Sequence, residues 1–282
     1  AAMGLKFENN WFSLISGFSA KTSIMFFPTK AEKSEKSEKE LGSFCRILFF
    51  LESQIKIPPC SVKTLYFCLM MNDKDSALKI AELLLQVKAV KLQPEEPFTW
   101  ASGWKSPIYC DNRITLSHPA VRTHIRQSIV KLIGEKFGKP DLIVGVATGA
   151  IAIGALVAQE MGLPFVYVRS AAKGHGRKNL IEGYYEKGQQ AVVIEDLIST
   201  GGSSLKAVES LRESGIEVKG LAAIFTYGFA ESQERFNKAE CAYSTLTDYA
   251  TLLEKALDSK YIKKDSLHLL REWSRDPSKW LN

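Results

Sequence analysis

Two adjacent carboxylates, Glu195 and Asp196, stand between an apolar run and a stretch of small residues. Residues 191–204 read AVVIEDLISTGGSS, so the apolar residues predict a buried strand, and the glycines and hydroxyls predict the turn into a helix. The N–H groups at such a helix start can cradle a phosphate. Carboxylates at the carboxyl end of a parallel strand can accept hydrogen bonds from vicinal sugar hydroxyls and help to hold a hydrated Mg²⁺. The run therefore predicts a site for a phosphorylated sugar; the alternative is an ordinary strand, turn and helix with an acidic cap.

A basic stretch over residues 167–183, which reads YVRSAAKGHGRKNLIEG, is the second candidate for chemistry. Glycines interrupt it, which disfavours a helix there. A cationic lid that neutralises a leaving pyrophosphate and excludes water explains this composition best, and a solvated basic loop is the alternative. Its basic or titratable side chains are Arg169, Lys173, His175, Arg177 and Lys178.

A third segment, residues 98–113, reads FTWASGWKSPIYCDNR. Its Ser102-Gly103 pair can turn backbone N–H groups toward a planar acid, and a plain surface turn before a strand is the alternative. The remaining histidines, His118, His124 and His268, lie beside or within expected helices, so we assign them no chemistry.

The three segments together resemble the orotate phosphoribosyltransferases, which are type I phosphoribosyltransferases. Residues 98–113 match an F-T-x-x-S-G-x-x-S-x-x-Y-x-D-x-R pattern, residues 169–176 match R-x-x-x-K-x-H-G, and residues 191–204 resemble the phosphoribosyl-diphosphate signature. Val-Ala-Thr-Gly at 146–149 fits the turn on the pyrophosphate side. The resemblance covers about residues 72–282. It implies an α/β type I fold, in which helices flank an open, mostly parallel β-sheet and the N- and C-terminal segments form a small hood.

The resemblance also implies a reaction and its residues. The reaction is Mg²⁺-dependent transfer of the 5-phosphoribosyl group to N1 of orotate, giving orotidine 5′-monophosphate and pyrophosphate in de novo pyrimidine synthesis. The implied catalytic residues are Lys173, His175 and Asp196. The implied contacts of phosphoribosyl diphosphate are Arg169, Lys173, His175, Glu195, Asp196, Leu197, Ile198, Ser199, Thr200, Gly201, Gly202 and Ser203. The implied orotate contacts are Ser199, Ser102 and Gly103. Mg²⁺ would be held mainly through substrate and water, without direct protein ligands, in a homodimer whose lids reach the neighbouring sites.

Two other functions remain open at this point. Some family members carry an orotate-binding arginine near residues 226–228, where this chain reads Thr-Tyr-Gly, and lysines where Ala101, Gly149 and Ser170 stand. A sister transferase acting on a purine or xanthine base is therefore the nearest rival. The second is a non-catalytic regulator that senses phosphoribosyl diphosphate and binds nucleic acid. Residues 71–282 hold 28 basic and 25 acidic residues, which predicts no nucleic-acid partner.

The elements that must position these segments form a regular series from residue 71 onward. Asp75 or Ser76 can cap a first helix, because apolar residues at 80, 83, 84 and 87 follow helical spacing. A second helix is expected from Pro119 to Phe137. Further strands are expected over 142–146, 165–169, 191–195 and 217–226, and further helices over 150–161, 202–213, 230–238, 248–257 and 265–274. Strands that alternate with helices predict a parallel sheet covered on both faces.

The first seventy residues differ from the rest in composition. They contain nine of the fifteen phenylalanines and a charge run over residues 30–40, KAEKSEKSEKE, without sustained helical or strand periodicity. We expect residues 1–70 to be a low-order N-terminal extension outside the catalytic fold and residues 71–282 to be the phosphoribosyltransferase domain. A targeting extension is the alternative.

Overall composition indicates a globular protein. The 282 residues are 45% hydrophobic and 24% charged, and the net charge is +6. The five cysteines include no C-x-x-C pair, which fits neither a disulfide framework nor a zinc site, so we expect a reducing, cytoplasmic setting. The uncharged run 142–159 is near the lower length limit of a membrane span, but its alanines and glycines favour a strand, a turn and a helix. No membrane partner is expected.

Overall fold

The computed structural model describes residues 59–100, 103, 105–171 and 180–280. The chain divides into two units, Ala1–Thr64 and Leu65–Asn282, and the second unit holds the sheet and the helices around it. The extension expected over residues 1–70 lies largely outside the described residues. Its separation from the catalytic fold stays a prediction.

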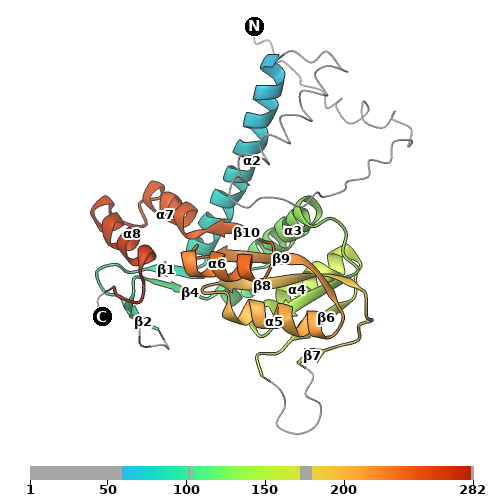
Figure 1. The fold of residues 1–282 in the computed structure, drawn as a ribbon. Helices are drawn as coiled ribbons and strands as arrows, with labels where there is room; N and C mark the ends of the chain where they lie inside the picture. The colour runs from blue at the N-terminus through green and yellow to red at the C-terminus, as the bar shows by residue number, and fades with distance from the viewer. Residues whose placement is uncertain (1–58, 101–102, 104, 172–179, 281–282) are drawn as a thin grey trace. The chain divides into compact units, whose positions relative to one another are not determined.

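A six-stranded sheet in the order β10-β9-β8-β5-β6-β7 forms the centre of the second unit (Figure 1). Each neighbouring pair is parallel except β6 and β7, which are antiparallel. The strands are β5 (Leu142–Val146), β6 (Phe165–Val168), β7 (Ile181–Glu182), β8 (Gln190–Ile198), β9 (Glu217–Thr226) and β10 (Tyr243–Asp248). The mostly parallel sheet expected from the alternation of strands and helices is confirmed.

Helices cover both faces of the sheet, because the central strands β5, β8 and β9 bury side chains on each side. On β8, Val192 and Ile194 belong to one hydrophobic cluster, which includes buried residues of α3 and α4. Ala191 and Val193 belong to the other, which includes residues of α5 and α6. The helices are α2 (Pro59–Gln86), α3 (Pro119–Lys136), α4 (Gly149–Met161), α5 (Gly202–Glu213), α6 (Ala230–Lys238), α7 (Tyr249–Asp258) and α8 (Leu267–Arg275).

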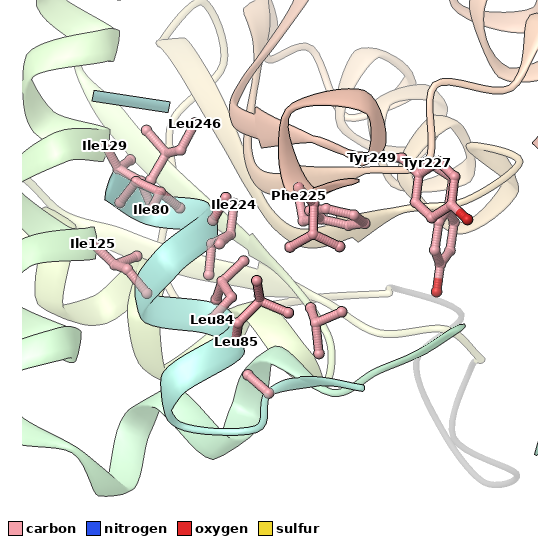
Figure 2. Close-up of a cluster of buried hydrophobic side chains, with 14 of the residues drawn as sticks. Ile80, Leu84, Leu85, Ile125, Ile129, Ile224, Phe225, Tyr227, Leu246 and Tyr249 are labelled. Atoms are coloured by element: carbon pink, nitrogen blue, oxygen red, sulfur yellow. The ribbon is translucent and has the colours of Figure 1, made fainter. Parts of the chain in front are cut away.

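The C-terminal part of α2 packs into the first of these clusters. Its buried residues Ile80, Leu84 and Leu85 lie beside α3 and the strands β9 and β10 (Figure 2). Their neighbours in the cluster include Ile125, Ile129, Ile224 and Leu246. The C-terminal part of α2 thus belongs to the core of the second unit.

Short elements before α3 and the C-terminal helices form the hood. Strand β1 (Val90–Leu92) pairs with β4 (Ile108–Cys110), and β2 (Phe98–Thr99) pairs with β3 (Lys105–Ser106). Two 3₁₀ helices complete the set, η1 (Asn112–Ser117) and η2 (Lys264–Ser266). The ring centroid of Trp100, beside β2, lies 5.7 Å from that of Trp273 in α8. The short strands and the C-terminal helices of the hood are therefore in contact.

Three expectations need correction. The helix expected from Asp75 or Ser76 already begins at Pro59, because no glycine or further proline interrupts residues 60–86. Strand β8 ends at Ile198 and not at residue 195, so both carboxylates lie within the strand. Strand β10 was not expected, because its sequence YSTLTD is mostly polar and only Leu246 and Thr247 are buried.

The uncharged run 142–159 resolves into β5, a turn and most of α4, as the sequence predicted. None of the helices in the described part of the chain combines the length and the apolar character needed to cross a bilayer.

Candidate active site

The side chains of Glu195 and Asp196 leave β8 on opposite faces, because successive residues of a strand alternate. Glu195 reaches toward α5, where the Oγ of Ser204 donates a hydrogen bond to its Oε2 at 2.8 Å. Asp196 faces α4, where its carboxylate lies against Gly149. The two carboxylates remain close enough for the charge of Asp196 to raise the pKa of Glu195.

Glu195 is the more buried of the two carboxylates, with only 4% of its surface exposed. Its Oε1 accepts a hydrogen bond from the backbone N–H of Asp196 at 3.2 Å. Burial, followed by the charge of Asp196, raises the pKa of Glu195 to about 8, although the Ser204 hydrogen bond opposes the shift. In this arrangement Glu195 supports the strand end from within, and direct contact with a sugar hydroxyl stays a prediction.

Asp196 is half-buried at the carboxyl end of the parallel strands, where ligands bind in open α/β sheets. A Cβ at Gly149 would overlap its carboxylate, so the carboxylate occupies space that only a glycine leaves open. Gly149 is the first residue of α4, whose N-terminus carries a partial positive charge. Burial raises the pKa of Asp196, and the charge of Arg113 opposes that shift.

The expected phosphate loop follows directly. Gly201 adopts a left-handed conformation with φ of 79° and precedes α5, which has no side-chain cap. A side chain there would also meet the ring of Phe236. Both the backbone conformation and the lack of space therefore require a glycine. Gly202 and Ser203 are exposed, and Ser199 and Thr200 are half-buried. The first turn of α5 thus presents small residues and uncapped N–H groups, which is an anion-binding arrangement.

The side chains of Leu197 and Ile198 pack into the two hydrophobic clusters and not into the loop. Thr226, at the end of β9, donates its hydroxyl to the carbonyl of Ile198 at 3.2 Å. The N–H of Tyr227 reaches the same carbonyl, also at 3.2 Å. Leu197 and Ile198 can therefore contribute to the site only through their backbone groups. The two hydrogen bonds from the end of β9 hold the backbone of Ile198 in place.

The structure describes the base of the expected lid and not its tip. The Nη1 of Arg169 lies 3.5 Å from Oε1 of Glu182, and Lys206 of α5 donates to the carbonyl of Ser170 at 3.0 Å. Lys173 and His175 lie outside the described residues, as does Ser102. Gly103 has φ of 88°, and its N–H donates to the carbonyl of Trp100 at 2.8 Å, so its N–H already has a partner within the hood.

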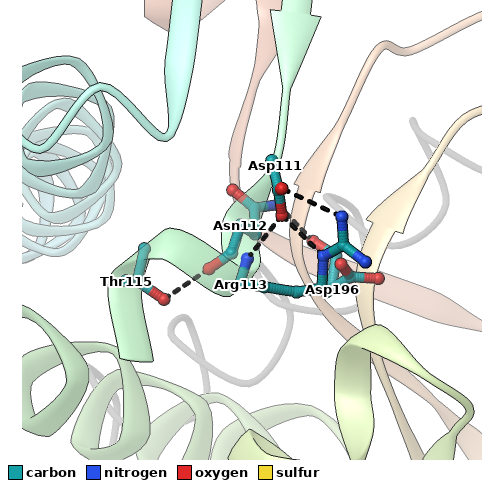
Figure 3. Close-up of polar contacts among 5 residues, drawn as sticks. All are labelled: Asp111, Asn112, Arg113, Thr115 and Asp196. Carbon is teal, nitrogen blue, oxygen red and sulfur yellow. Dashed lines mark hydrogen bonds and ion pairs between the residues drawn. The ribbon is translucent and has the colours of Figure 1, made fainter. Parts of the chain in front are cut away.

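Sequence reasoning assigned no role to the residues that lie beside Asp196 in the structure (Figure 3). The carboxylate of Asp111 caps η1 by accepting from the N–H of Arg113 at 3.1 Å, and it also pairs with Nε at 2.7 Å and Nη2 at 2.9 Å. The hydrogen bonds and charge of Arg113 lower the pKa of Asp111. Asn112 donates from Nδ2 to the backbone carbonyl of Asp196 at 2.6 Å. Asp111 and Arg113 stood in the matched 98–113 pattern, whereas nothing marked Asn112.

Comparisons with known proteins show which family the chain belongs to. A family model described as the phosphoribosyl transferase domain matches residues 114–253. The orotate phosphoribosyltransferase of Porphyromonas gingivalis is 56% identical over 201 residues, which is 71% of this chain and 96% of that protein. This chain belongs to the orotate phosphoribosyltransferase family. A second orotate phosphoribosyltransferase, from Phocaeicola vulgatus, is 57% identical over 200 residues, covering 71% of this chain and 94% of that protein.

The orotate phosphoribosyltransferases also share the fold. The crystal structure of the Aeropyrum pernix enzyme has a TM-score of 0.57 at 28% identity and covers 62% of this chain and 97% of that one. The resemblance and the type I fold predicted from the three motifs are therefore confirmed.

Proposed function

We propose that the chain transfers the 5-phosphoribosyl group from phosphoribosyl diphosphate to N1 of orotate. One observation carries the proposal: in a member of this family, the carboxylate of Asp196 and the uncapped N-terminus of α5 lie together at the carboxyl end of a parallel sheet. In the reaction the N1–C1′ bond forms, the C1′–O bond to pyrophosphate breaks, and N1 loses its proton.

Different described residues bind different parts of the phosphoribosyl group. The first turn of α5, with the hydroxyls of Ser199, Thr200 and Ser203, binds the 5′-phosphate, because uncapped N–H groups and a helix dipole favour an anion. Asp196 accepts hydrogen bonds from the ribose hydroxyls. The negative carboxylate also stabilises the positive charge that develops on the ribose as the C1′–O bond breaks. Catalysis then consists mainly of positioning and electrostatics.

Pyrophosphate leaves toward the basic stretch. Arg169, Lys173 and His175 neutralise its charge, and Lys173 or His175 donates a proton to it; the motif supports these roles. On the base side, the backbone around Gly103, Ser102 and the hydroxyl of Ser199 contact orotate.

The site fits Mg²⁺ as a substrate-borne ion. The Asp196 carboxylate is a hard oxygen donor of the kind that Mg²⁺ prefers. By the family resemblance, the ion would be held mainly by phosphoribosyl-diphosphate oxygens and water near Asp196, where it would neutralise charge on the diphosphate.

The proposal extends to assembly and setting. A homodimer in which each lid serves the neighbouring site follows from the resemblance, and the length of the basic stretch supports it. For the setting we keep the cytoplasm, because the spacing of the five cysteines fits neither a disulfide framework nor a zinc site.

The test is a turnover assay with purified protein, phosphoribosyl diphosphate and Mg²⁺. Orotate, uracil, xanthine and the purine bases are supplied singly, and loss of orotate is followed by absorbance. We expect orotate to be consumed with matching release of pyrophosphate. Turnover of a purine base instead, or binding of phosphoribosyl diphosphate without any turnover, would overturn the assignment.

A pair of variants ties the activity to the site. Asp196→Asn should lower kcat/KM by roughly 10²-fold, because a charge-assisted acceptor for the ribose is lost. Asp141→Asn is the matched control, because this exposed aspartate caps the opposite end of the sheet by accepting from the N–H of Gln190 at 2.9 Å. It should leave kcat/KM unchanged.

A further inference from the structure

Strand β8 extends beyond the end of its pairing with β5, and the extension begins just before the two carboxylates. Strand β5 pairs with β8 only as far as Gly145 and Ile194, whereas β8 continues beside β9 to Ile198. In the described part of the chain, no strand pairs with β8 beyond Ile194 on the β5 side. Backbone N–H and C=O groups that point to this side need other partners, because a buried polar group without one is costly.

Two side chains supply those partners to Asp196. The Oε1 of Glu195 accepts from its N–H at 3.2 Å. The Nδ2 of Asn112 donates to its C=O at 2.6 Å, across a sequence separation of 84 residues. Both backbone polar groups of the ribose-side carboxylate residue are therefore fixed by side chains where the strand ladder has ended.

Asn112 is almost fully buried, and its bond to the Asp196 carbonyl does not satisfy all of its polar atoms. Only 2% of its surface is exposed, and its Oδ1 has no hydrogen-bond partner among the described residues. Burial raises the pKa of the Cys110 thiol, at the end of β4, and the nearby Asn112 amide opposes that shift. The Nδ2 of Asn112 thus joins the hood to β8 through its bond to Asp196.

Asn112 is itself held firmly. It is the first residue of η1, which the Asp111 carboxylate caps. The hydroxyl of Thr115, also buried, donates to the carbonyl of Asn112 at 2.6 Å. Figure 3 shows these residues beside Asp196. The contacts fix the backbone that carries the Asn112 side chain.

We propose that Asn112 is a positioning residue: it fixes the backbone of Asp196 so that the carboxylate stays at its place against Gly149. The inference rests on the proposed function, since it gives Asp196 the task of binding the ribose. Through Asn112, the segment expected on the orotate side is joined to the residue on the phosphoribosyl-diphosphate side.

The test compares Asn112→Asp with Ser232→Ala. N112D has the same size but replaces the donor with an acceptor that faces the Asp196 carbonyl. We expect the KM for phosphoribosyl diphosphate to rise roughly 10- to 100-fold, because a buried acceptor loses its partner, while the KM for orotate changes less than about threefold. S232A removes an equally buried hydrogen bond, from the Oγ of Ser232 in α6 to the carbonyl of Phe229 at 2.7 Å, that touches neither Asn112 nor Asp196. It should leave both KM values near wild type.

A double-mutant cycle separates positioning from general damage. In the Asp196→Asn background, N112D should reduce kcat/KM by less than about threefold, because the carboxylate that it positions is already missing. Asn112→Ala, which brings no charge into the core, is carried through the same measurements. The proposal would be overturned if the double variant lost kcat/KM by the product of the two single losses, or if S232A changed the KM values as much as N112D. Wild-type kinetics in N112D, or failure of both Asn112 variants to fold, would also overturn it. A wild-type protein that does not turn over orotate would instead refute the proposed function.

Discussion

Gly149 and Asp196 share one space: the carboxylate of Asp196 lies where a Cβ of Gly149 would stand. Gly149 is not among the glycines with positive φ, so the requirement at this position is room and not backbone freedom. Some relatives were expected to carry a lysine here. In this chain a side chain of any size would have to displace the carboxylate.

Gly149→Ala should therefore act on the chemistry through Asp196. The added methyl displaces the carboxylate, and a misplacement of about 1 Å can cost roughly 10²-fold in rate. We expect kcat/KM for phosphoribosyl diphosphate to fall by that order. Steady-state kinetics with saturating orotate measure it.

Gly134→Ala is the control for this substitution. It lies within α3, and a Cβ there meets nothing within 4 Å. Alanine should stabilise the helix by about 0.5–1 kcal/mol and leave the kinetics unchanged. Wild-type kinetics in the Gly149 variant would show that the Asp196 carboxylate has another productive position.

Glu195 should make stability depend on pH. Its pKa in the folded protein, about 8, is above the ordinary value of 4.5, so its favourable contribution is complete below about 4.5 and is lost as the pH rises through 8. Glu195→Gln keeps an oxygen that can accept from Ser204 but does not ionise. As the pH rises from 5 to 9, this variant should gain unfolding free energy relative to wild type, by up to about 4 kcal/mol.

Denaturant unfolding of both proteins at each pH measures this gain, and the ionisations of groups that do not interact with Glu195 cancel in the difference. A difference that stays constant across the range, or one that falls with pH, would contradict a buried and protonated Glu195.

Residues before Met71 should be dispensable for catalysis even though α2 begins at Pro59. The buried face of the described part of α2 begins at Ile80, and the ion pair of Lys74 with Glu254, at 2.8 Å, would be kept. A chain of residues 71–282 should retain the kcat/KM and melting temperature of the full chain. A chain beginning at Gln86 is the contrast, because loss of Ile80 and Leu84 should cost several kcal/mol and unfold it. A large loss on removing residues 1–70 would show that they belong to the catalytic fold.

Shared active sites can be tested by subunit exchange. Lys173→Ala and Asp196→Asn proteins, each nearly inactive alone, are mixed under conditions in which exchange is demonstrated. If the lid serves the partner's site, one site of each mixed dimer collects both lesions and the other collects neither. Random pairing then leaves about a quarter of all sites intact. A mixture as inactive as its parents would place each lid in its own subunit.

The sequence predicted the fold well where local signals were long and strong. Pro119 and Gly138 bracket α3, and the apolar run 142–146 is β5 within the same limits. Strands of two or three residues, such as β2 and β3, are too short to leave a periodic pattern, so the hood could be expected only from the family resemblance. Strand β10 was missed because an edge strand needs few apolar residues.

The candidate site likewise contains residues that the local sequence predicts and residues that it does not. Glu195, Asp196 and Gly201 are neighbours in the chain, and their types and spacing together predict the phosphate loop. Asn112 contributes a single amide whose partner is 84 residues away, and no local pattern marks such a contact. The space shared by Gly149 and Asp196 likewise depends on how α4 packs against β8, which composition does not encode.

The strand order has a consequence for how the chain folds during synthesis. Strand β5 is made first but stands inside the sheet, between β6 and the later β8. Ile80 of α2 packs with Ile224 of β9 and Leu246 of β10, and Trp100 rests on Trp273 near the C-terminus. These long-range contacts make folding slow, and a nascent chain that ends before β9 exposes the apolar faces of its earlier elements. Synthesis must reach β10 before the buried face of α2 can be covered. A premature stop that removes α8 would leave Trp100 of the hood without its partner Trp273.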